Sequence, residues 1–103
     1  MSEFVKVAES AGIEPGMLQE VEVGGRTIAL ANVGGTIYAI DNTCTHRGCS
    51  LAEGELDGEV VTCPCHGGQY NVKTGEVLRS PPPRGVQSFA VKVEGGSILV
   101  DQP

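Results

Sequence analysis

All four cysteines and both histidines of this 103-residue chain lie between residues 44 and 66. They form two short groups: the first runs from Cys44 to Cys49 (CTHRGC), and the second runs from Cys63 to His66 (CPCH). Sixteen residues separate His46 from Cys63. Thiolates and imidazoles bind borderline and soft transition metals. Residues 44–66 therefore contain every Cys and His side chain that this chain could offer to such a metal.

The remainder of the chain has the composition of a β protein. It contains two Tyr, two Phe and no Trp, with fifteen Gly and six Pro. Its core must therefore come from Val, Ile, Leu and Ala, and many tight turns must connect the elements. The length predicts a single domain over residues 1–103.

Alternating apolar and polar residues predict strands, and three glycine pairs stand where two-residue hairpin turns require positive φ. These pairs are Gly24-Gly25, Gly34-Gly35 and Gly95-Gly96. The predicted strands cover residues 4–8, 17–23, 26–33, 36–40, 89–94 and 97–101, with a loop over 9–16. Since no segment has helical apolar spacing over three turns, the predicted fold class is all-β.

Residues 41–85 interrupt this pattern and contain both ligand-type groups. We expect a β base formed by residues 1–40 and 86–103, with residues 41–85 inserted as the metal-binding part. Inside the insert, short strands are predicted near 60–61 and 69–72, with a turn at 73–75. The three prolines at 81–83 cannot donate ladder hydrogen bonds, so residues 80–85 are predicted to be a stiff, extended loop.

Charge limits the possible partners. Seven Lys and Arg against thirteen Asp and Glu give a net charge of −6, which argues against nucleic acid and anionic membranes and favours a basic partner. No apolar run approaches the ~20 residues of a membrane span, and the N-terminus does not read as a secretion signal. We expect a cytoplasmic protein. The acidic residues between the two groups form either a solvated face or a docking patch; they are Glu53, Glu55, Asp57 and Glu59.

Three kinds of site compete for the cysteines and histidines. A disulfide framework leaves His46 and His66 unexplained, and nothing points to secretion. Two Cys and two His satisfy tetrahedral zinc, but the usual finger has a pair of Cys and a separate pair of His. One Cys and one His from each group instead suit two metals, with thiolates on one iron and imidazoles on the other.

The spacing Cys-x-His, sixteen residues, Cys-x-x-His resembles that of the Rieske family, matched here by Cys44, His46, Cys63 and His66. The resemblance implies a Rieske-type antiparallel β-sandwich with an inserted cluster-binding subdomain and one 2Fe-2S cluster. Cys44 and Cys63 would bind one iron, and His46 and His66 the other. Neutral imidazoles leave the oxidised site uncharged, which implies a potential between about −150 and +300 mV, against about −400 mV for plant-type ferredoxins.

Five further positions take expected roles from the same resemblance. Cys49 and Cys65 match a pair that forms a disulfide between the ligand loops in one branch of the family, although a reducing cytoplasm would favour two buried thiols. Tyr70 matches a tyrosine whose hydroxyl donates to the sulfur of the residue matching Cys44. Gly68 stands where quinol-oxidising members have a Ser that donates to a bridging sulfide, and Arg47 stands where they have an apolar residue.

The resemblance implies a soluble electron carrier and not an enzyme. Such a ferredoxin would pass one electron at a time from an NAD(P)H-dependent flavoprotein reductase to a terminal ring-hydroxylating oxygenase. Two alternatives remain open at this point. The chain could be a small relay subunit of an enzyme complex such as nitrite reductase, or it could be a structural zinc domain.

Overall fold

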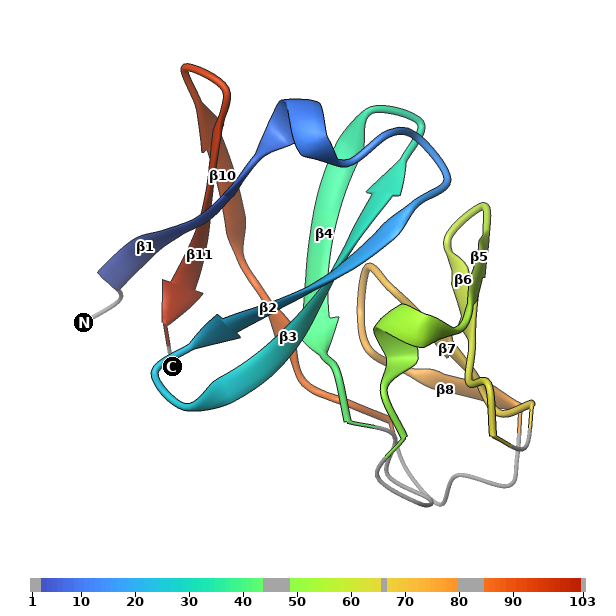
Figure 1. The fold of residues 1–103 in the computed structure, drawn as a ribbon. Coiled ribbons are helices and arrows are strands. Elements are labelled where there is room, and N and C mark those ends of the chain that lie inside the picture. Colours follow the sequence, from blue (N-terminus) through green and yellow to red (C-terminus); the bar gives the residue numbers. More distant parts are fainter. Residues whose placement is uncertain (1–2, 44–48, 66, 80–84, 103) are drawn as a thin grey trace.

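The structure, a computed structural model, describes residues 3–43, 49–65, 67–79 and 85–102. Its strands form three antiparallel sheets (Figure 1). The first contains, in spatial order, β1 (Glu3–Glu9), β11 (Ser97–Gln102) and β10 (Val91–Glu94). The second contains β2 (Leu18–Val23), β3 (Arg26–Val33), β4 (Thr36–Asp41) and β9 (Ser88–Phe89). The third contains β5 (Glu55–Asp57), β6 (Val60–Thr62), β7 (Gln69–Asn71) and β8 (Val77–Arg79).

Helical structure in these residues is limited to two single turns of 3₁₀ helix, η1 (Ser10–Gly12) and η2 (Leu51–Glu53). The all-β prediction is therefore confirmed. No helix in the described part of the chain is long and apolar enough to cross a membrane.

The predicted hairpins are confirmed in type as well as in place. Gly24-Gly25 and Gly34-Gly35 have φ values of 56°, 83°, 59° and 101°, which L-residues with a Cβ seldom adopt. They connect β2 to β3 and β3 to β4, so that Val23 pairs with Arg26 and Val33 with Thr36. Each pair of glycines thereby fixes the register of its hairpin.

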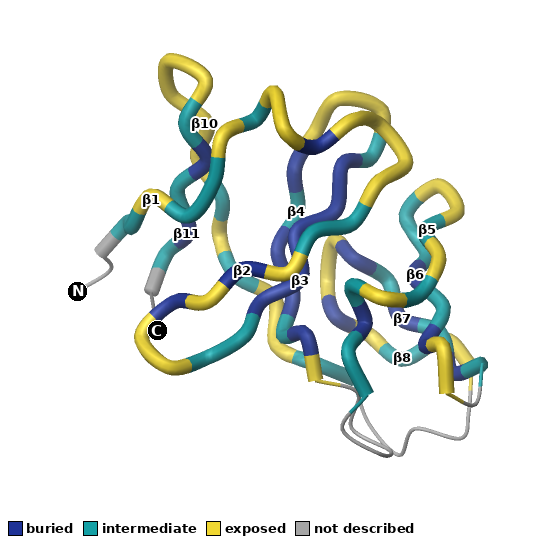
Figure 2. The backbone as a smooth tube through the Cα atoms, in the orientation of Figure 1, coloured by how far each residue is buried: buried dark blue, intermediate teal, exposed yellow. Residues whose placement is uncertain are grey.

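Strand β3 is buried on both faces (Figure 2). Ile28 and Leu30 point into a cluster that also contains Val21, Ile98 and Val100, between the first and second sheets. Ala29 and Ala31 point the other way, into a cluster with residues of the third sheet. The two alanines thus share one core with Leu51 of η2 and with Val61 and Tyr70 of the third sheet.

Two predictions of local structure were wrong. Residues 89–94 form two strands and not one, because the chain breaks at Ala90: β9 pairs with β4, whereas β10 pairs with β11. The predicted loop at 9–16 contains the turn η1. The proline loop predicted at 80–85 lies outside the described residues except for Gly85.

Gly54 brings η2 against the end of β6. A Cβ at this position would overlap the backbone carbonyl oxygen of Thr62, and it would also crowd the carbonyl oxygen of Leu51. Thr62 directly precedes Cys63, and it pairs with Glu55. The absence of a side chain at Gly54 therefore allows η2, which follows the first ligand-type group, to contact the end of β6, which precedes the second group.

We predict that Gly54→Ala destabilises the fold by about 1–3 kcal/mol, the usual cost of overpacking. Gly12→Ala is the matched control, because a Cβ at Gly12 would meet no atom within 4 Å and this residue has no positive φ. Urea denaturation of both variants checks this. Equal midpoints for the two variants would contradict the close approach at Gly54.

Candidate metal centre

Of the four predicted ligands, Cys63 lies within the described residues. It follows β6 directly and is 3% exposed. It belongs to the cluster that contains Ala29, Ala31 and Tyr70. The other three predicted ligands, Cys44, His46 and His66, lie outside the described residues, as does Arg47.

The second ligand loop is closed by backbone hydrogen bonds. The amide of Cys63 donates to the carbonyl oxygen of Gly68 at 2.7 Å, and the amide of Gly67 donates to the carbonyl oxygen of Cys63 at 3.2 Å. The chain then turns directly into β7, which pairs with β6. Hence the β6–β7 pairing and the tight loop both constrain the position of Cys63.

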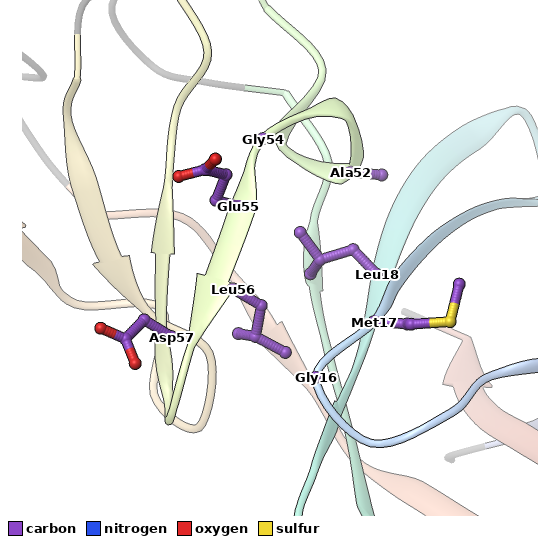
Figure 3. A pocket seen from close by; sticks show the side chains of 8 residues that line it. All are labelled: Gly16, Met17, Leu18, Ala52, Gly54, Glu55, Leu56 and Asp57. Carbon is purple, nitrogen blue, oxygen red and sulfur yellow. The ribbon is translucent and has the colours of Figure 1, made fainter.

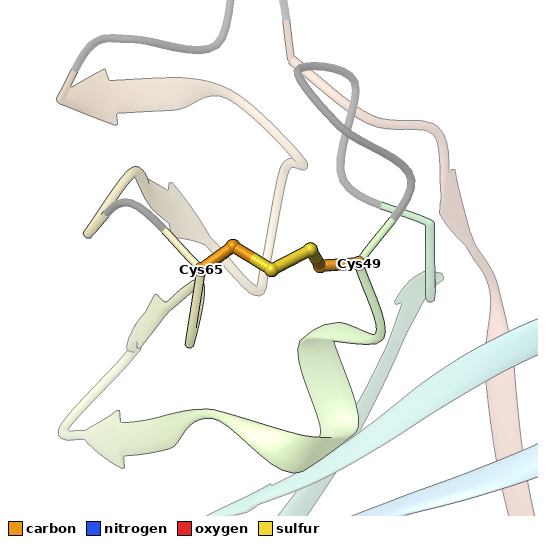
Figure 4. Close-up of a disulfide and its surroundings, with 2 residues drawn as sticks. All are labelled: Cys49 and Cys65. Carbon is orange, nitrogen blue, oxygen red and sulfur yellow. A yellow bond between two sulfur atoms is a disulfide. The ribbon is translucent and has the colours of Figure 1, made fainter.

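Cys49 and Cys65 form a disulfide (Figure 4). This confirms the pairing that the resemblance implied, and the alternative of two thiols is wrong. The bond joins the segment before η2 to the loop after β6. The sulfurs of Cys49, Cys63 and Cys65 all lie within 4.8 Å of one another, so the bridge holds the two loops together directly beside the Cys63 thiol.

Tyr70 and Gly68 are both buried. Tyr70 lies on β7, opposite Val61 of β6, and is fully inaccessible to solvent in the same cluster as Cys63. A phenol that is buried in this way usually has a hydrogen-bond partner for its hydroxyl. Its place in that cluster fits the role expected for Tyr70, which stays a prediction, as does the role of Gly68.

Sequence reasoning missed Asn42, which is 4% exposed at the end of β4. Its side chain bonds with Glu20, Ser50 and the amide of Ala52, at 2.9–3.1 Å. A buried amide is unfavourable unless it is hydrogen-bonded in this way. An asparagine before a glycine- and cysteine-rich loop reads as an ordinary turn residue, so no signal in the sequence distinguished it.

A shallow groove of about 600 Å³ lies between the start of β2 and the hairpin of β5 (Figure 3). Met17, Leu18 and Leu56 line it, with Glu55 and Asp57 on β5. It contains neither cysteine nor histidine. This groove is therefore distinct from the site around Cys63.

The described part of the site fits a cluster held by thiolates and imidazoles. Cys63 is buried in an apolar cluster at the start of a glycine-containing loop. Cys49 and Cys65 form the disulfide, so the four predicted ligands are the other Cys and His residues of the sequence. Two Cys and two His are the set that a Rieske cluster uses.

We predict that replacing both bridge cysteines, as Cys49→Ser with Cys65→Ser, lowers the temperature at which the visible absorbance is lost. Closing a loop with a sequence separation of 16 is worth about 3 kcal/mol on the chain-entropy model. Thermal melts followed by absorbance provide the measurement. The single variant Cys49→Ser serves as control, since losing one partner already breaks the bridge and its curve should match that of the double variant. Superimposable curves for the wild type and the double variant would remove this role from the bridge.

Comparison with known proteins agrees with this site. Residues 3–90 match the Rieske 2Fe-2S domain. The chain is 41% identical over 98 residues to Ferredoxin CarAc of Metapseudomonas resinovorans, covering 94% of this chain and 92% of that protein. The ferredoxin of carbazole 1,9a-dioxygenase from Nocardioides aromaticivorans IC177 superimposes with a TM-score of 0.93 at 31% identity, covering 97% and 98% of the two chains.

A second solved structure is a complex of reduced oxygenase and oxidised ferredoxin in carbazole 1,9a-dioxygenase. It matches with a TM-score of 0.89 at 40% identity, over 95% of this chain and 92% of that one. Both the sequence match and the fold extend over nearly the whole chain. This protein therefore belongs to the Rieske 2Fe-2S domain family.

Proposed function

We propose that this protein is the ferredoxin component of a ring-hydroxylating dioxygenase system. It would carry single electrons from a flavoprotein reductase to a terminal oxygenase, without catalysing a reaction itself. The observation that carries this proposal is the match to ferredoxins over 92–98% of their own length. One of these ferredoxins has been solved in a complex with its oxygenase.

The proposed ligands are Cys44 and Cys63 for one iron and His46 and His66 for the other. When bound, the cluster supplies one-electron transfer. Cys63 supports the assignment, because it is buried, outside the disulfide and held by the β6–β7 loop. Of the earlier alternatives, a structural zinc domain does not agree with a family defined by a 2Fe-2S cluster.

Charge on η2 and on β5 of the third sheet supports a basic protein partner. Glu53, Glu55 and Asp57 are exposed, and none of the ion pairs found among the described residues involves them. Glu59 differs, because a side-chain hydrogen bond from Lys73 lowers its pKa and the two groups form an ion pair at 3.0 Å. The acidic surface available for steering a partner is therefore Glu53, Glu55 and Asp57.

The organisation of the chain follows from the same assignment. We propose one domain over residues 1–103, in which residues 1–40 and 86–103 are the β base and residues 41–85 are the cluster-binding insert. The third sheet, formed within residues 55–79, supports this division. A cytoplasmic location is proposed because a reductase that uses NAD(P)H draws on the cytoplasmic pool.

Reconstitution tests the proposed function. The purified protein should contain two iron and two acid-labile sulfide per chain, with an EPR signal on reduction. After chemical reduction it should transfer one electron to the oxidised oxygenase of carbazole 1,9a-dioxygenase. Stopped-flow absorbance measures this transfer. Cys63→Ser is the control and should hold no cluster. Colourless protein with bound zinc would contradict the proposal, and co-purification with an enzyme subunit would favour the relay alternative.

Substitutions at Tyr70 and Gly68 should shift the reduction potential of the cluster in opposite directions. Tyr70→Phe should lower the reduction potential, because it removes a donor that favours the reduced state. Gly68→Ser should raise it by adding one. Protein-film voltammetry measures both. Potentials equal to that of the wild type in both variants would mean that these residues do not contact the cluster sulfurs.

A further inference from the structure

The two ligand loops are closed in different ways. The loop from Cys63 to Gly68 is closed by backbone hydrogen bonds, and the side chain of Gln69 donates to the Thr62 Oγ1 at its base, at 3.2 Å. The first loop lies between Thr43 and Ser50. These two residues form a single β-bridge, which we call the neck of the loop. Side chains hold this neck, which makes the first loop depend on residues that lie far from it in the sequence.

Asn42 connects both sides of the neck. Its Nδ2 donates to the Ser50 Oγ at 2.9 Å, and its Oδ1 accepts from the amide of Ala52 at 2.9 Å. Its backbone carbonyl oxygen accepts from the amide of Leu51 at 2.8 Å. The chain that enters the loop is thus bonded at three points to the chain that leaves it.

Glu20 completes this network from β2. Its Oε1 accepts from Asn42 Nδ2 at 3.1 Å and from Ser50 Oγ at 3.1 Å. Asn42 Nδ2 therefore uses both of its hydrogens, and the Ser50 hydroxyl both donates and accepts. Because a single oxygen of Glu20 accepts from both groups, it fixes the two side chains relative to each other.

We propose that Glu20 is a positioning residue for the first ligand loop, acting through Asn42 and Ser50. The neck sets the separation of Thr43 and Ser50, between which the ligands proposed at Cys44 and His46 lie in the sequence. The role of Glu20 is to accept two hydrogen bonds and not to supply charge. This inference rests on the proposed function, because it concerns the ligands assigned there.

Three variants test the role. Glu20→Ala removes both hydrogen bonds, Glu20→Gln keeps an acceptor oxygen without the charge, and Glu22→Ala removes an exposed carboxylate on the same side of β2. Glu20→Ala should lose its cluster about tenfold faster than the wild type, with altered EPR g-values and visible circular dichroism. Glu20→Gln should retain the wild-type spectra and rate, and so should Glu22→Ala.

A second readout does not depend on the cluster. Amide hydrogen exchange at Leu51 and Ala52, which donate to Asn42, should be about tenfold faster in Glu20→Ala, with exchange in the β2–β3 hairpin unchanged. If Glu20→Ala does not fold, Ser50→Ala removes the second partner and gives the same test. Wild-type spectra and wild-type amide exchange in Glu20→Ala and Ser50→Ala would overturn the role. Altered spectra together with faster exchange in Glu20→Gln would also overturn it.

The wild-type protein separates this inference from the proposed function. If the wild type has the spectra of a Rieske cluster and reduces the oxygenase, but Glu20→Ala behaves in the same way, only the positioning role is overturned. If the wild type holds no such cluster, the proposed function fails, and the positioning role fails with it.

Discussion

The burial of β3 on both faces is the constraint on which the rest of the structure depends. Ile28 and Leu30 anchor the first two sheets, while Ala29 and Ala31 receive the third sheet on the opposite face. A strand that is shared in this way cannot shift its register by one residue, because the shift would exchange large and small side chains between the two cores. The third sheet, and Cys63 with it, is therefore positioned by the same pairing that forms the base.

The two ligand loops meet because three short-range constraints act together. Gly54 allows η2 to contact Thr62, the Cys49–Cys65 bond joins the loops, and the Cys63–Gly68 hydrogen bonds close the second loop. Each constraint acts within a few residues of a proposed ligand. Since ligand orientation tunes a metal site, these constraints bear on how Cys63 is held.

Patterns with a local physical cause were predictable from the sequence. The paired glycines required positive φ between the segments 17–23, 26–33 and 36–40, so the β2–β3–β4 meander followed from the sequence. The break at Ala90 did not, because it depends on which sheet has a free edge. The disulfide came from a resemblance and not from spacing. Asn42 and Glu20 could not be predicted, because their partners lie 8 to 30 residues away.

The two ligand loops differ in how far their conformation depends on side chains. Backbone hydrogen bonds at Cys63 and Gly68 do not depend on side-chain identity, so in the second loop the substitutions expected to disturb the path are those at Gly67, with its φ of 76°, and at Cys65 in the disulfide. The neck of the first loop is held by side chains on β2, β4 and the segment before η2, and each can change by a single substitution. Variation among Rieske ferredoxins that alters the ligand geometry without altering the fold is therefore expected at the first loop and its partners on β2.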